Sequence, residues 1–170
     1  MDTFRSYIVA FALALCAALP ARAASVLPLY LEDLAAQSTT VFQGQAIENR
    51  TVRDAATGLV VTYTTFEVTD VLKGTAGKTL EIKQIGGTLS GEAIQYKVLG
   101  VPTFTVGEEY FVFLAGVSSA GFSSPIGLSQ GRFKVDTTSG AKRVSNGRLK
   151  EVDLDEFKQV VRSHLRAVAR

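Results

Sequence analysis

The chain has 170 residues, of which 46% are hydrophobic and 20% are charged, and its formal net charge is +2. This length accommodates one domain, and the apolar content is enough for a packed core, which excludes a disordered chain. Fifteen glycines and four prolines fit a turn-rich β domain. The near-neutral charge gives no indication of nucleic-acid binding, and we expect no specific binding of that kind.

Residues 1–24 have the pattern of a secretory signal peptide. An apolar run at residues 8–19 is followed by Ala-Arg-Ala at residues 21–23, a small-x-small cleavage site. The run is shorter than the ~20 apolar residues of a membrane helix, so no transmembrane segment is expected after signal removal. The only cysteine, Cys16, lies inside this run. We therefore expect an exported chain, periplasmic or extracellular, without thiol chemistry; the alternatives are an uncleaved anchor and a lipid-modified cysteine.

The first element predicted after the signal is a short amphipathic helix, because Leu27, Tyr30, Leu31 and Leu34 recur at helical spacing. We expect this helix to plug one open end of a barrel. Residues 39–50 are predicted to form the first strand. Gly44, in the middle of that strand, indicates a close backbone approach or a bend.

Residues 60–74 form the longest run dense in β-branched and aromatic side chains, which predicts a central strand. Phe66 and Val68 alternate on one face, but two residues separate Val68 from Val71, as happens where a bulge is inserted. Coiled, bulged strands of this kind are typical of barrels. Residues 79–85 follow as the third of three consecutive antiparallel strands.

Three further strands are predicted downstream, at residues 93–99, 110–114 and 132–135. The second is apolar on both faces, as in a strand that is covered on both sides. The third is expected to be the last strand and to close the barrel. The fold class is therefore all-β: residues 25–140 form a small antiparallel OB-like barrel of about five to six strands that carries the N-terminal helix.

Residues 141–170 are predicted to form a basic connector, residues 141–152, and a C-terminal amphipathic helix. Asp153 followed three residues later by Glu156 is a capping-box signal at the helix start. The predicted apolar stripe of the helix consists of Leu154, Phe157, Val161, Leu165 and Val168.

A row of four cations recurs every fourth residue along that helix: Lys158, Arg162, Arg166 and Arg170. Residues 141–170 carry eight Lys and Arg against four Asp and Glu, so the row is a candidate anion-binding site that could dock the helix on an anionic surface. The alternative is a solvated face, because cations stabilise the C-terminal end of a helix. In either case we expect the row to face solvent.

Residues 127–131, Gly-Leu-Ser-Gln-Gly, match the G-x-S-x-G motif of serine hydrolases, and Asp153 and His164 follow in the order that those enzymes use. The motif needs a parallel strand before it and a helix after it, whereas here an alternating strand pattern follows Ser129. We therefore expect a glycine-rich bend and no hydrolase activity. His164 is the only histidine and has no acidic neighbour in sequence, so neither a metal nor a cofactor is expected.

Several segments between Pro28 and Val135 carry a resemblance: the short Leu-rich helix, the strand with its central glycine, and residues 62–74, 100–114 and 127–135. They resemble a group of uncharacterised exported bacterial proteins. The first half of the chain, through its strand-turn-strand portion that ends in Leu-Lys-Gly, is also similar to the netrin-type modules of metalloproteinase inhibitors, which are OB-like barrels. Those inhibitors reach zinc through an amino-terminal cysteine, which the mature chain lacks. We expect a non-catalytic binding or protein-interaction module for a protein or envelope component; the alternative is an envelope polyanion binder that uses the basic helix.

Overall fold

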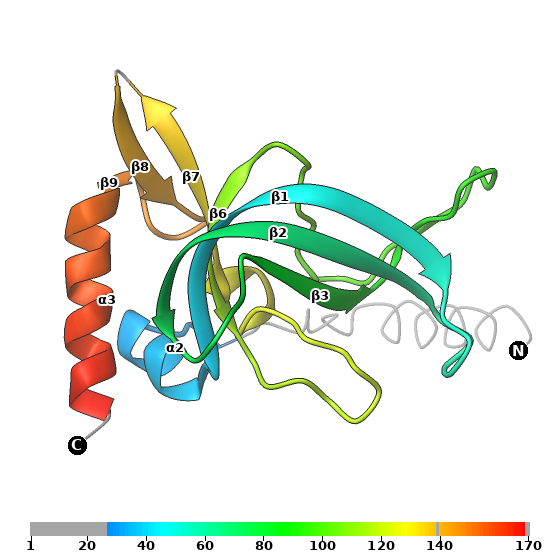
Figure 1. The fold of residues 1–170 in the computed structure, drawn as a ribbon, viewed down its shortest axis with the longest axis horizontal. Helices are drawn as coiled ribbons and strands as arrows, with labels where there is room; N and C mark the ends of the chain where they lie inside the picture. The colour runs from blue at the N-terminus through cyan, green and yellow to red at the C-terminus, as the bar shows by residue number, and fades with distance from the viewer. Residues whose placement is uncertain (1–26, 139, 169–170) are drawn as a thin grey trace, which may run out of the picture.

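A computed structural model describes residues 27–138 and 140–168, so residues 1–24, which the sequence predicts to be a signal peptide, and Arg170 lie outside the described part (Figure 1). Within the described residues the fold is mostly β, with a seven-stranded antiparallel sheet, a two-stranded ribbon and two α-helices. The order of strands in the sheet is β3-β2-β1-β6-β7-β8-β9. The two end strands, β3 and β9, do not pair with each other among the described strands, so the expected closure of a barrel is not observed.

Neighbouring strands of the sheet are consecutive in the chain, except that β1 also pairs with β6. The sheet strands are β1 (Thr40–Arg53), β2 (Val60–Lys73), β3 (Thr79–Ile85), β6 (Glu109–Leu114), β7 (Arg132–Thr138), β8 (Ala141–Ser145) and β9 (Val152–Asp153). The ribbon strands are β4 (Gly87–Thr88) and β5 (Gln95–Tyr96), and the helices are α2 (Leu31–Gln37), the 3₁₀ turn η1 (Leu128–Gly131) and α3 (Leu154–Val168).

The bulge predicted in β2 is confirmed by its pairing with β1, in which Thr69 is the extra residue between Val68 and Asp70. The two long strands curve together across the molecule (Figure 1). One detail of the prediction is wrong: Val71 is 36% exposed, whereas the next residue, Leu72, packs against the core. The bulges re-aim the side chains that follow them, which an alternation pattern alone does not anticipate.

The close approach predicted at Gly44 is also confirmed. A Cβ atom at this position would lie 2.7 Å from the carbonyl oxygen of Glu67 on β2. A Cβ atom is not tolerated so close to a backbone oxygen, so a glycine is required where β1 runs beside this part of β2.

The strand predicted at residues 93–99 is wrong in its extent. Only Gln95 and Tyr96 are in a strand, and they pair with β4 in the separate ribbon. Gly86 and Gly87, with φ angles of +99° and +131°, redirect the chain after β3. The apolar residues of the segment therefore find no covering layer, and Leu99 is 91% exposed.

Residues 132–135 are not the last strand, and the connector predicted after them contains two more strands. β7 runs on to Thr138 and pairs with β8 in a hairpin that projects from the body of the molecule (Figure 1). Val144 on β8 pairs with Val135 and is fully buried. A single buried valine among polar residues supplies too weak a pattern to predict a strand from sequence.

β6 is covered on both faces, as predicted for residues 110–114. Phe111 and Phe113 belong to a cluster under the two helices, whereas Tyr110, Val112 and Leu114 belong to a second cluster on the opposite face. All five side chains are buried. The sheet thus separates two cores, and the second of them borders the site described below.

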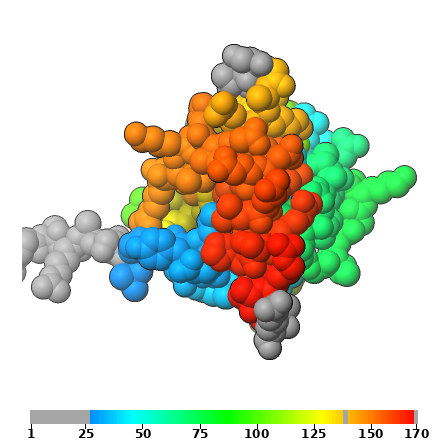
Figure 2. Space-filling view, turned by 90° about the vertical axis from the view of Figure 1, so that its left-hand side faces the viewer, coloured from blue at the N-terminus to red at the C-terminus, as the bar shows by residue number. Residues whose placement is uncertain are grey.

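The helices lie side by side over the first core (Figure 2). α2 starts at Leu31, later than predicted, and Leu27 and Tyr30 are exposed, so these two residues do not form a core-facing stripe. The helix covers the sheet together with α3 rather than plugging a barrel. None of the described helices is both long and apolar enough to cross a membrane.

The start predicted for α3 is confirmed, because the carboxylate of Asp153 accepts the N–H groups of Asp155 at 2.9 Å and Glu156 at 3.2 Å. The predicted apolar stripe is buried over its first half only. Leu154, Phe157 and Val161 are buried, Leu165 packs at the margin of the core, and Val168 is 49% exposed.

Candidate functional site

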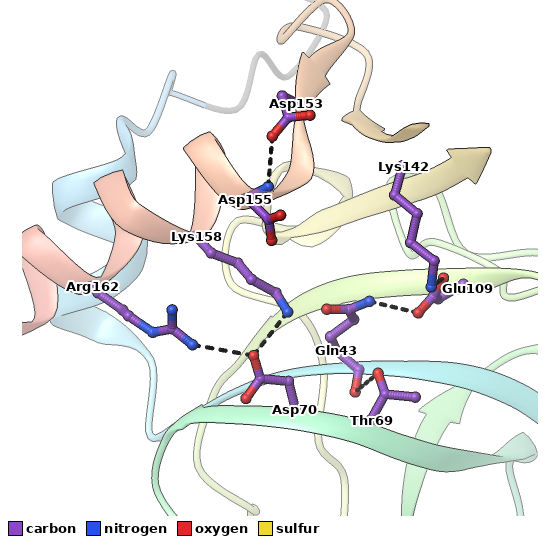
Figure 3. Close-up of polar contacts among 9 residues, drawn as sticks. All are labelled: Gln43, Thr69, Asp70, Glu109, Lys142, Asp153, Asp155, Lys158 and Arg162. Carbon is purple, nitrogen blue, oxygen red and sulfur yellow. Dashed lines mark hydrogen bonds and ion pairs between the residues drawn. The ribbon is translucent and has the colours of Figure 1, made fainter. Parts of the chain in front are cut away.

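The predicted anion-binding row lies on α3, but two of its four cations pair with the sheet (Figure 3). The Lys158 ammonium lies 2.8 Å from a carboxylate oxygen of Asp70 on β2, and the Arg162 guanidinium lies 3.3 Å from the same oxygen. The expectation of a solvated row is wrong for Lys158, whose side chain is only 14% exposed. Arg166 is exposed, and Arg170 lies outside the described residues.

The position of Asp70 explains this pairing. Asp70 follows the bulge residue Thr69, and a bulge changes the direction in which the next side chains leave the strand. The same region contains a second polar group, in which Glu109 accepts a hydrogen bond from Gln43 at 2.5 Å and pairs with Lys142 at 2.7 Å (Figure 3). These contacts fasten α3 to β2 and connect β8 with β6 and β1 within the sheet, so the cluster is structural.

Replacing Lys158 by Gln is expected to lower the free energy of unfolding by about 1–2 kcal/mol, between the cost of breaking an exposed ion pair and that of breaking a buried one. Arg166→Gln is the matched control, because Arg166 is exposed and has no ion-pair partner in the described chain; its effect is expected to stay within about 0.5 kcal/mol. Urea unfolding measures both. Equal effects would mean that the contact with Asp70 contributes no stability.

Ser129 lies in the 3₁₀ turn η1 and is exposed. The turn leads into the antiparallel strand β7, so the strand-turn-helix arrangement of a hydrolase is not present around it. Among the described residues, no hydrogen bond joins Ser129 to Asp153 or His164, which belong to the start and the body of α3. The structure therefore does not bring the three residues of the motif into contact through hydrogen bonds.

A cleft that the sequence analysis missed lies on one face of β1, β2 and β3, and its volume is about 280 Å³. The ribbon and the segment that follows it form its other walls. Its floor consists of paired residues: Thr51 lies opposite Thr62, Asn49 opposite Thr64, and Thr62 opposite Gln84. Because directly opposed residues of antiparallel strands share a face, the three strands present these polar side chains together.

Hydrogen bonds among the floor residues use most of their donors. The Thr62 hydroxyl donates to the carbonyl of Gly86 at 2.7 Å, so the Thr51 hydroxyl, 2.9 Å away, donates to Thr62. The Thr64 hydroxyl donates to the side-chain oxygen of Asn49 at 2.7 Å. The hydroxyl oxygens of Thr51 and Thr64 keep lone pairs that can accept further hydrogen bonds.

Gln84 is the unusual residue of the floor. It is only 4% exposed, and its side-chain nitrogen is buried without a hydrogen-bond partner in the described chain. An unpaired buried donor costs about 1–3 kcal/mol, and native proteins contain few of them. Because Gln84 lines the cleft, the missing partner is the feature expected of a site that receives an acceptor from a ligand.

Aromatic and apolar side chains form the rest of the lining, with Phe104 at the inner end and Tyr96 on the ribbon side. Phe104 packs edge to face against Phe66 and against Tyr110, with 4.9 Å between ring centroids in each case. This end of the cleft is therefore continuous with the second core. The described lining contains one charged residue, Lys97, and no carboxylate.

A polar network holds the segment that carries Phe104. The Tyr110 hydroxyl donates to Glu108 at 2.6 Å and accepts the N–H of Thr105 at 3.0 Å, while Lys134 pairs with Glu108 at 3.0 Å. The hydrogen bonds from Tyr110 and Lys134 lower the pKa of Glu108, whereas burial, aided by Glu108, raises the pKa of Tyr110. Both shifts keep the phenol neutral and the carboxylate charged near neutral pH, which maintains the network.

The opposite face of β3 is fastened by Lys83, the neighbour of Gln84. The Lys83 ammonium lies 2.9 Å from the Asp54 carboxylate and donates to the carbonyl of Ala120 at 2.9 Å. Hydrogen bonds from Thr57 and then from Lys83 lower the pKa of Asp54. The strand that carries Gln84 is thus held from behind by the β1–β2 turn and by the loop that contains Ala120, which gives the cleft a rigid floor.

No protein-family model matches this chain, and no curated protein matches it. Within residues 27–138 and 140–168, no group of three His, Cys, Asp or Glu side chains is placed to hold a metal ion.

A sequence signal for the cleft does exist in β2. Thr62 and Thr64 have the same parity as Phe66, so they lie on the face that Phe66 buries. Polar residues in register with a buried face are uncommon, and here they mark the place where the core ends and the cleft begins. Gln84 has the same parity as Leu80 and Ile82, which pack in the second core, so it too is a polar residue in register with a buried face.

Proposed function

We propose that this chain is a non-catalytic binding module and that the cleft on β1, β2 and β3 is its binding site. The observation that carries the proposal is Gln84, a residue of the cleft lining whose buried side-chain nitrogen has no partner in the described chain. A ligand that offers an acceptor to this nitrogen would satisfy it. Export through the segment at residues 1–24 is part of the proposal, as is a protein or envelope component as the source of the ligand.

An OB-like, netrin-like architecture is also proposed rather than established. The coiled, bulged pair β1 and β2 supports it, as does the antiparallel pairing of the third consecutive strand, β3, with β2. In OB-folds a sheet face and the loops beside it bind ligands, and the cleft here is likewise lined by a sheet face and the segments beside it. The proposal of a binding module does not depend on this likeness, because the cleft is argued from its own side chains.

The alternative, docking of the basic helix on a polyanion, has less support. Lys158 and Arg162 contact Asp70, so only part of the predicted row is free to contact an anion. The cleft, by contrast, combines a concave surface with an unpaired donor in its lining.

The test compares three forms of the purified chain as bait for an envelope fraction: the wild type, Gln84→Met and Gln159→Met. Methionine matches glutamine in length but lacks the donor, and Gln159 is an exposed residue of α3. We expect the wild type and Gln159→Met to retain a component for which Gln84→Met has an affinity at least about tenfold lower. This is the effect of roughly one hydrogen bond to a buried group. Equal retention by all three forms would place binding outside the cleft.

A further inference from the structure

We propose that the ligand of the cleft is a neutral saccharide, an inference that rests on the proposed binding function. The floor offers two kinds of group: hydroxyl oxygens of Thr51 and Thr64, which keep acceptor lone pairs, and the side-chain nitrogen of Gln84, which lacks an acceptor. A sugar hydroxyl is both a donor and an acceptor, so adjacent hydroxyls of one ring complement both kinds of group.

The lining also suits the apolar side of a sugar ring. Tyr96 is half-buried beside the cleft, and its hydroxyl donates to Glu92 at 3.1 Å, which holds the ring in place. Aromatic rings with one anchored polar end present large, rigid contact surfaces at little entropic cost. The C–H face of a sugar can pack on this ring while its hydroxyls reach the polar floor.

The size and charge of the cleft favour a small uncharged ligand. A volume of about 280 Å³ is at the lower end of the roughly 300–1,000 Å³ typical of ligand pockets, which suits one or two sugar rings. The described lining has no carboxylate for an amino group, and Lys97, its single cation, is exposed. A charged ligand would therefore lose hydration without gaining a buried counter-ion.

An extended peptide fits less well. Peptides commonly bind β-domains by pairing with a free strand edge. The outer edge of β3 is occupied at Lys83, whose carbonyl accepts the N–H of Ser123 at 3.0 Å, and β4 and β5 pair with each other. An added peptide strand would therefore have to displace the contact at Lys83 in the middle of the β3 edge.

The experiment is an NMR titration of the full chain with three neutral disaccharides as probes: cellobiose, maltose and N,N′-diacetylchitobiose. At least one is expected to bind and to shift the side-chain amide signals of Gln84 and the backbone signals of the floor. Gln84→Met and Tyr96→Ala should each weaken that binding at least about tenfold. Gln159→Met and Tyr30→Ala are the matched controls, since both lie outside the cleft, and should leave the dissociation constant unchanged.

A purely structural Gln84 would give a different result, because its replacement would lower the melting temperature without a specific effect on sugar affinity. Gln84→Met is expected to keep or raise the melting temperature while binding is lost, since the variant removes an unpaired buried donor. Sugar binding that survives in Gln84→Met would overturn the inference. So would saturation of the cleft by a neutral oligopeptide of Ala and Ser in place of any disaccharide.

The titration also separates this inference from the proposed function. If no disaccharide binds while the envelope fraction still contains a component that only chains with Gln84 retain, the module stands and the saccharide assignment is wrong. If both experiments fail, the cleft is not a binding site and both proposals fall together.

Discussion

Replacing Phe66 by Ala is expected to lower the free energy of unfolding by about 3–5 kcal/mol, the usual cost of deleting a buried aromatic side chain. Phe66 is fully buried and packs edge to face against Phe42, at 5.2 Å between centroids, and against Phe104, at 4.9 Å. Such pairs stabilise beyond their buried area. Urea unfolding followed by circular dichroism measures the loss.

The same substitution tests whether the core supports the cleft. Phe104 lines the cleft and packs against Phe66, so the space that Phe66→Ala leaves allows Phe104 to move. Phe66→Leu is the control: it keeps most of the apolar volume and is expected to cost less than about 1.5 kcal/mol. A loss below 1 kcal/mol for Phe66→Ala would mean that the second core repacks freely and gives the cleft no fixed wall.

Replacing Gly87 by Ala is expected to abolish retention of the ligand and to destabilise the ribbon by about 1–3 kcal/mol. Gly87 has a φ angle of +131°, which side chains rarely adopt. A Cβ atom there would also collide with the Thr62 hydroxyl and lie 2.7 Å from a methyl carbon of Thr51. The ribbon would have to leave the floor, which opens the cleft.

Gly91→Ala provides a matched control in the same excursion of the chain. Gly91 also has a positive φ, +83°, but a Cβ atom there meets nothing within 4 Å. This variant carries the backbone strain without the collision. Hydrogen exchange should therefore accelerate at β4 and β5 in Gly87→Ala far more than in Gly91→Ala. Equal exchange rates at β4 and β5 in the two variants would show that the contact with Thr51 and Thr62 does not hold the ribbon in place.

Local pattern was sufficient for several elements. The three strands up to Ile85 follow from β-branched density, the bulge at Thr69 follows from one break in alternation, and the N-cap of α3 follows from Asp153. Each of these features depends on residues a few positions apart, whose spacing is written directly in the sequence. The strand at residues 110–114 belongs with them, because a run that is apolar on both faces has to be covered on both faces.

Where the interacting residues are distant in sequence, local pattern was insufficient. Lys158 and Asp70 pair across two elements, so the periodicity of α3 predicted a solvated row where the fold places a contact. The strand β8 depends on Val144 finding Val135 across a turn. Residues 93–99 have the alternation of a strand but meet no second layer, so most of the segment does not become one.

The cleft is the extreme case of this dependence. Thr51, Thr62 and Gln84 come from three strands, and their shared face exists only once the register of β1, β2 and β3 is set. Thr62 could be placed on the inner face from its parity with Phe66, but nothing local indicates that Gln84 would be buried without a partner. Burial and hydrogen-bond satisfaction are properties of the packed chain, because they depend on which distant groups come within reach.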